Sequence, residues 1–225
     1  MVLIATKTRK GAVVQLTVEQ KISKARMDAR KLFPYWKKIF DRMQFIEIPA
    51  VGTMGVTHNL VCGWNRKFVE GCSLSELTMT IVHEACHLLL KHPQRGCKML
   101  GKNPDDLSKM GEIVKKSPVL KRKHMLANIS FDMSINMLLE EIANERNTTG
   151  AWTAPYKLPD GYIVPETFDL ERGEVAEYYF KKLLDKEKDK EEDDNTDDGD
   201  GESGNDSDQE NKNSDGDSSN EGESG

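Results

Sequence analysis

Residues 77–90, LTMTIVHEACHLLL, form an apolar run without Pro or Gly that contains two histidines and one glutamate. At 3.6 residues per turn this run predicts a helix that is apolar almost all round, which is typical of a buried helix. His83 and His87 project from one side of such a helix, close enough to bind one metal ion together. Glu84 would lie beside that metal, placed to take a proton from a metal-bound water.

A chance match explains this His-Glu-x-x-His pattern poorly. With 5 His and 20 Glu in 225 residues, roughly 0.01 accidental matches are expected. The polar side chains of the helix also fall on one stripe, formed by Glu76, Thr80, His83, Glu84, His87 and Lys91. Buried polar groups must be paired or coordinated. The alternative is two hydrogen-bonded core histidines with Glu84 in an ion pair, but motif and context favour a metal site of the zinc-peptidase type.

The remaining patterns predict an α+β fold that is mostly helical, with a small sheet ahead of the metal helix. Ser73 and Glu76 fit a capping box that begins this helix near residue 73, and Pro93 predicts its end near His92. Thr17 and Gln20 fit a second capping box, which begins a helix at residues 17–32. Other helices are expected at residues 34–43, 104–114, 118–144 and 173–185. Strands are expected at residues 45–48 and 55–64, and an irregular segment at 151–169.

Charge divides the chain sharply. Residues 186–225 contain 17 Asp and Glu against 4 Lys, whereas residues 1–185 contain 28 Lys and Arg against 21 Asp and Glu. The acidic segment has almost no apolar residue, so it is expected to be a disordered tail that solvates, links or engages a protein partner. Residues 1–185 suffice for one domain with a single core. Because the basic charge of this domain is spread out, nucleic acid is not expected as a partner.

The cysteines and the N-terminus bear on the compartment. Four cysteines without CxxC spacing and without a secretion signal are typical of reduced thiols. The apolar run at residues 2–5 is too short for a signal peptide, and no stretch reaches the roughly 18 apolar residues of a membrane span. A cytoplasmic protein without membrane partners is therefore expected.

A catalytic zinc usually takes three protein ligands and leaves a fourth position for water. Candidates for the third ligand are His58, His92, His124, Asp132, Glu140 and Glu141. His92 follows His87 by five residues, which rotates it by about 140° around the helix axis. We therefore expect His92 to contact a metal-binding residue or the substrate, and not to bind the metal itself.

The helix at 118–144 offers a better third ligand. One polar line of Asn128, Asp132 and Asn136 runs through its apolar surface. A buried carboxylate between two amides needs a partner, which a metal supplies. We predict Asp132 as the third ligand, with Asn128 and Asn136 orienting it or the histidines. The alternative is a structural polar ladder between helices.

Several segments together resemble a known family over roughly residues 15–185. They are the strand at Gly55-Val56, Asn65-Arg66-Lys67-Phe68, Leu74-Ser75-Glu76-Leu77, His83-Glu84-x-x-His87, His92-x-x-Arg95, Ala127-x-x-x-x-Asp132-x-x-Ile135-Asn136, the turn Pro159-Asp160-Gly161 and the helix at 174–184. This order is similar to a metallopeptidase domain family of bacteria and phages, which often precedes a von Willebrand A-like domain. Family members commonly have Pro where this chain has Arg66, and this sequence continues into the acidic tail where that second domain would follow.

The resemblance implies a zincin-like core, His83, His87 and Asp132 as zinc ligands, and Glu84 as catalytic base. The expected function is hydrolysis of peptide or protein substrates that lie extended near residues 55–63. His92, Arg95 and His124 are the candidates for stabilising the oxyanion. Two alternatives remain open at this point. One is a peptidase whose third ligand is a His or Glu, and the other is a non-catalytic, metal-stabilised protein-interaction module.

Overall fold

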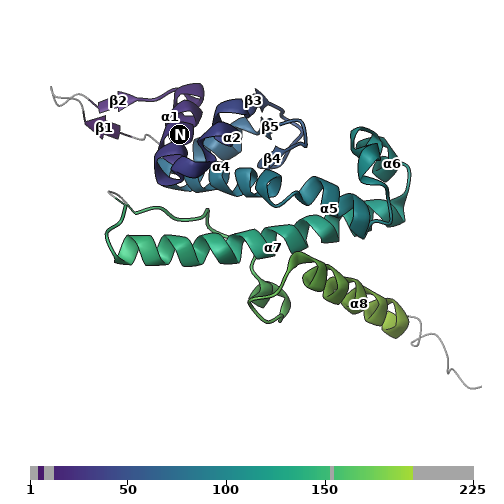
Figure 1. Ribbon diagram of the computed structural model, residues 1–225. Helices are drawn as coiled ribbons and strands as arrows, with labels where there is room; N and C mark the ends of the chain where they lie inside the picture. The colour runs from purple at the N-terminus through teal and green to yellow at the C-terminus, as the bar shows by residue number, and fades with distance from the viewer. Residues whose placement is uncertain (1–4, 8–12, 153–154, 195–225) are drawn as a thin grey trace, which may run out of the picture. The chain divides into compact units, whose positions relative to one another are not determined.

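The computed structural model describes residues 5–7, 13–152 and 155–194 (Figure 1). As the sequence predicts, the fold is α+β and mostly helical. The elements are β1 (Ala5–Lys7), β2 (Val13–Gln15), α1 (Val18–Leu32), α2 (Lys37–Arg42), β3 (Gln44–Glu47), β4 (Met54–Val56), β5 (Val61–Trp64), α3 (Arg66–Gly71), α4 (Leu74–Leu89), α5 (His92–Met99), α6 (Met110–Lys115), α7 (Pro118–Thr148) and α8 (Ala176–Asp194). The chain divides into two units, residues 1–188 and 189–225, and the first contains all the elements from β1 to α7.

Helices α1 and α4 pack against each other at the centre of the main core. Both predicted capping boxes are confirmed: Thr17 begins α1 and Ser73 begins α4, each with reciprocal side-chain to backbone hydrogen bonds. The apolar part of the buried surface of α4 consists of Leu77, Met79, Ile81, Val82, Ala85 and Cys86. This apolar burial holds α4 in place and leaves its polar stripe to face the remaining elements.

The small sheet has the order β3-β5-β4, with β5 parallel to β3 and antiparallel to β4. Within β5, a Cβ atom at Gly63 would lie 2.7 Å from the Cδ1 atom of Ile48, so a larger residue there would force the Ile48 side chain to shift. Strand β4 pairs only with β5 among the described strands and lies against α4. The β4 edge of the sheet is therefore brought beside α4.

Helix α7 lies alongside α4 (Figure 1) and joins two apolar clusters. Its C-terminal half adds Ile135, Leu139 and Ala143 to the main core. Its N-terminal half packs Leu126, Phe131 and Met133 on Ala176, Tyr179, Phe180 and Leu183 of α8. Because both halves of α7 are anchored, the polar residues between them have a defined position relative to α4.

Three predicted boundaries were wrong. Helix α4 ends at Leu89, not near His92, because Lys91 adopts the left-handed conformation with φ 55° and begins the new helix α5. Helix α7 continues to Thr148 and α8 continues to Asp194, both beyond their expected ends. The rest of the expected acidic tail, residues 195–225, lies outside the described residues. None of the helices in the described part of the chain combines the length and apolarity that a membrane crossing requires.

Candidate metal site

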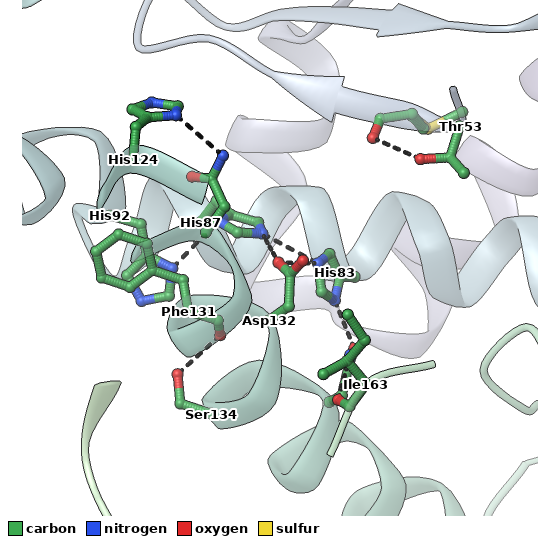
Figure 2. Close-up of polar contacts among 12 residues, drawn as sticks. Thr53, His83, His87, His92, His124, Phe131, Asp132, Ser134 and Ile163 are labelled. Carbon is green, nitrogen blue, oxygen red and sulfur yellow. Dashed lines mark hydrogen bonds and ion pairs between the residues drawn. The ribbon is translucent and has the colours of Figure 1, made fainter. Parts of the chain in front are cut away.

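Three side chains from two helices meet between α4 and α7 (Figure 2). The Nε2 atoms of His83 and His87 lie 3.0 Å apart, one helical turn from each other on α4. The Oδ1 atom of Asp132 on α7 lies 3.3 Å from Nε2 of His83 and 3.1 Å from Nε2 of His87. The predicted ligands are thus brought together, and their donor atoms form a compact triangle that could hold a metal ion.

The ring nitrogen of His83 that points away from the donor triangle, Nδ1, binds the side-chain amide of Asn136, and the orientation of this amide is fixed. Asn136 is buried one turn after Asp132, and its Nδ2 donates a hydrogen bond of 2.9 Å to the carbonyl oxygen of Ile163. Its Oδ1 must therefore accept from Nδ1 of His83, at 2.8 Å. In its neutral form His83 then carries its proton on Nδ1 and has a lone pair on Nε2, the atom that lies next to Asp132 and His87.

The outer nitrogen of His87 contacts a third histidine. Nδ1 of His92 lies 3.2 Å from Nδ1 of His87, and the His92 ring stacks on Phe131 with a centroid distance of 4.1 Å. The turn at Lys91 produces this contact, because it reverses the rotation that a continuous helix would impose on His92. As expected, His92 touches a metal-site histidine and stays outside the donor triangle.

The charges of the donor triangle favour an ionised carboxylate. Burial alone raises the pKa of Asp132, but hydrogen bonds from His83 and His87 outweigh it and hold this pKa well below its usual range. Burial lowers the pKa of His83, yet the hydrogen bond to Asp132 and the nearby Glu84 charge raise it overall. The two helices thus present one negative group and two imidazoles at a single point, a combination that attracts a cation.

Glu84 lines the same cavity as the three donors. This cavity has a volume of about 390 Å³ and lies between α4, α7, β4 and residues 158–163. Only 5% of Glu84 is exposed, yet its carboxylate forms no hydrogen bond or ion pair with any described residue. The alternative in which Glu84 serves a structural ion pair finds no partner in this part of the chain. Its carboxylate is free for a molecule in the cavity.

The other candidate residues lie elsewhere. Glu140 accepts from Tyr162 and pairs with Arg172, so its carboxylate is already engaged. Arg95, a candidate for stabilising the oxyanion, forms a two-pronged ion pair with Glu177. These contacts exclude both residues from the metal site as it stands.

The remaining polar candidates face a neighbouring cavity. Asn128 is exposed, and its Nδ2 donates to Nδ1 of His124 at 3.4 Å. Asn128 also lines the metal-site cavity, but within the described residues it forms no hydrogen bond with Asp132 or with the two α4 histidines. His58 and His124 line this second cavity, outside the donor triangle.

Sequence reasoning missed residues 158–163, which form one wall of the metal-site cavity. Their position depends on the Ile163 carbonyl bound by Asn136, a long-range contact that no local pattern reveals. Comparison with family models, with curated proteins and with solved structures found no match.

Proposed function

We propose that this protein is a zinc-dependent metallopeptidase with a zincin-like core, related to the bacterial and phage family that its motifs resemble. The observation that carries the proposal is Glu84, a buried residue that lines the same cavity as the His-His-Asp triangle and whose carboxylate has no partner among the described residues. A purely structural metal site would need no such group and would usually be closed by four ligands.

The donor geometry supports zinc as the metal. Bonds of about 2.0–2.1 Å in a tetrahedral arrangement place donor atoms roughly 3.3 Å apart. The three donor distances of 3.0, 3.1 and 3.3 Å come close to this value. Two imidazoles and one carboxylate also leave a fourth position for water on the side of the cavity.

The proposed chemistry assigns one task to each group. Bound zinc would lower the pKa of a water to about 7 and polarise the scissile carbonyl. Glu84 would accept the proton of the attacking water and pass it to the leaving amine. His83, His87 and Asp132 would hold the metal, and Asn136 would keep the Nε2 lone pair of His83 directed at it.

The free edge of β4 supports a peptide as the substrate. Thr53, Met54, Gly55 and Val56 line the metal-site cavity, and β5 occupies only the other edge of this strand. An extended peptide can add to such an edge through main-chain hydrogen bonds. The sequence placed the substrate near residues 55–63. Within this range only β4 can pair with a substrate, because β5 is paired on both sides. The four free cysteines fit a reducing compartment, and we include a cytoplasmic location in the proposal.

The test is Glu84→Gln in the zinc-loaded protein, with a peptide library as substrate and cleavage read by mass spectrometry. We expect zinc content to stay at the wild-type level and cleavage to fall by about 10²–10⁴-fold, because general-base catalysis is lost. Asp160→Asn is the matched control, since Asp160 lines the same cavity but is exposed and paired with Lys157. Unchanged cleavage in Glu84→Gln would refute the role of Glu84. A wild-type protein that holds zinc and cleaves no peptide would favour the interaction module.

A further inference from the structure

A second cavity, with a volume of about 270 Å³, adjoins the metal site. Val56, His87 and Asn128 line both cavities, so the two meet at one of the proposed zinc ligands. A molecule bound at the metal would therefore border the second cavity directly. The proposed chemistry gives this space no role.

The lining of the second cavity differs in chemistry from that of the first. Among the residues that the structure describes, no Lys, Arg, Asp or Glu lines the second cavity, whereas Glu84, Asp132 and Asp160 line the first. Its apolar wall is formed by Val56, Leu100, Leu107, Met110, Ala127 and Phe131. Burial lowers the pKa of His124, which keeps this histidine neutral at neutral pH. The rest of the lining includes Thr57, Asn128 and four histidines. A cavity of this size with an apolar wall suits one apolar side chain and would disfavour a carboxylate that has to give up its water.

The position of Glu84 decides which side of the scissile bond enters the second cavity. Glu84 lines only the first cavity, and in the proposed function it gives a proton to the leaving amine. The residue that carries this amine must therefore lie in the first cavity. The acyl part of the substrate then extends to the other side of the metal, past His87.

We propose that the second cavity binds the side chain of the substrate residue on the acyl side of the scissile bond and selects a large apolar residue there. This inference rests on the proposed function. It assigns a specificity role to α5, to α6 with the turn that precedes it, and to the N-terminal half of α7.

Binding of small metal-chelating ligands tests the inference without any turnover. N-acetyl amino acid hydroxamates of Phe, Leu, Ala and Asp anchor on the metal and carry their side chain on the acyl side. Isothermal titration of the zinc-loaded protein should give a Kd for the Phe and Leu ligands at least about 10-fold lower than for the Ala ligand, because each buried methylene in such a pocket contributes about 10–200-fold. The Asp ligand should bind most weakly.

Filling the cavity should remove this preference. Gly96 on α5 lines the cavity, and a Cβ atom there would lie 3.4 Å from Cε2 of Phe131, an approach that needs little adjustment. Gly96→Leu should abolish the advantage of the Phe and Leu ligands and leave the Ala ligand and the zinc content unchanged. Gly111→Leu is the matched control, because Gly111 is an exposed helical glycine outside both cavities.

A second variant protects the test against a misfolded Gly96→Leu protein. Leu107→Ala removes part of the apolar wall and should weaken the Phe and Leu ligands by about 10-fold while the Ala ligand is unaffected. Equal affinities for all four ligands in the wild type, or a preference that neither variant changes, would overturn the inference. Selective binding without cleavage of any peptide would refute the proposed function and leave the apolar cavity supported. Cleavage of peptides without selective binding would support the proposed function and refute the role of the second cavity.

Discussion

His83 and His87 lie one turn apart on the same helix, yet their outer nitrogens meet different partners. His83 binds Oδ1 of Asn136, an acceptor whose direction is set by the hydrogen bond to Ile163. His87 meets the ring nitrogen of His92, which can donate or accept according to its tautomer. The orientation of His83 is thus fixed by its partner. The partner of His87 can instead change between donor and acceptor when the protonation of His87 changes.

This difference indicates how the site can fold without metal and still bind it. Because Nδ1 of His83 is bound to Asn136, Nε2 is the nitrogen of His83 that would face a cation, once it no longer donates to Asp132. Nε2 of His87 can donate to Asp132 in the metal-free protein and must present its lone pair once a metal binds. Neutral His87 would then carry its proton on Nδ1, where it can donate a hydrogen bond to Nδ1 of His92.

The largest effect is expected for Asp132→Ala, which removes the group that both histidines share. Loss of a residue that only orients a metal ligand typically lowers metal affinity by about 10–100-fold. Asp132→Ala should lower zinc affinity by more than this, because a charged ligand itself is lost. Competition with a chromophoric chelator measures this change. Asp160→Ala, the matched carboxylate in the same cavity, should retain wild-type affinity. Similar affinities for the two variants would exclude Asp132 as a ligand.

Asn136→Leu should have the next largest effect, because it removes the acceptor that orients His83. We expect zinc affinity to fall by about 10–100-fold. The free energy of unfolding should also fall by about 1–3 kcal/mol, since the Ile163 carbonyl loses its donor. Asn128→Leu is the control on the same helix, because the hydrogen bond of Asn128 goes to His124 and not to a proposed zinc ligand. Equal zinc affinities of Asn136→Leu and Asn128→Leu would contradict the claim that Asn136 orients His83 for metal binding.

His92→Phe should weaken zinc binding less than Asn136→Leu does. Phenylalanine retains an aromatic ring against Phe131 and removes the Nδ1 partner of His87. The buried Nε2 of His92 has no hydrogen-bond partner in the described residues, so nothing is lost there. Chelator competition on the two variants side by side gives the comparison. A larger loss of zinc affinity in His92→Phe than in Asn136→Leu would contradict the expectation that Asn136 contributes more to zinc binding than His92.

The smallest effect concerns the pH dependence of the zinc-free protein. Burial, together with His87 and Arg95, lowers the pKa of His92 to about 3. Below the ordinary histidine pKa of about 6.5 the unfolded chain takes up a proton that the folded chain refuses, so this residue lowers the free energy of unfolding as pH falls toward 3. Urea denaturation at pH 7.5 and 5 should show a smaller loss in His92→Phe than in wild type. Equal losses would contradict the neutral, buried state of His92.

The sequence predicted the features that depend on local spacing. The capping boxes at Thr17 and Ser73 and the placement of both histidines on one side of α4 follow from residues three or four apart. Asp132 was also recognisable, because a carboxylate stands out on an otherwise apolar helical surface. The pairing of this surface with the polar stripe of α4 needed only the rule that buried polar groups require partners.

Features that depend on tertiary contacts were beyond the sequence. A lysine in the left-handed conformation at position 91 is unusual, and only Pro93 hinted at a break there. The end of α4 was therefore placed too late, and α5 was not expected. The cavity wall at 158–163 and the engagement of Arg95 by Glu177 both join residues far apart in the chain.

Metal analysis combined with zinc K-edge X-ray absorption tests the central claim most directly. The account predicts one zinc per chain, bound by two imidazole nitrogens at about 2.0–2.1 Å and by a carboxylate oxygen, and lost in His83→Ala. A properly folded protein that contains no transition metal and does not take up added zinc would contradict it.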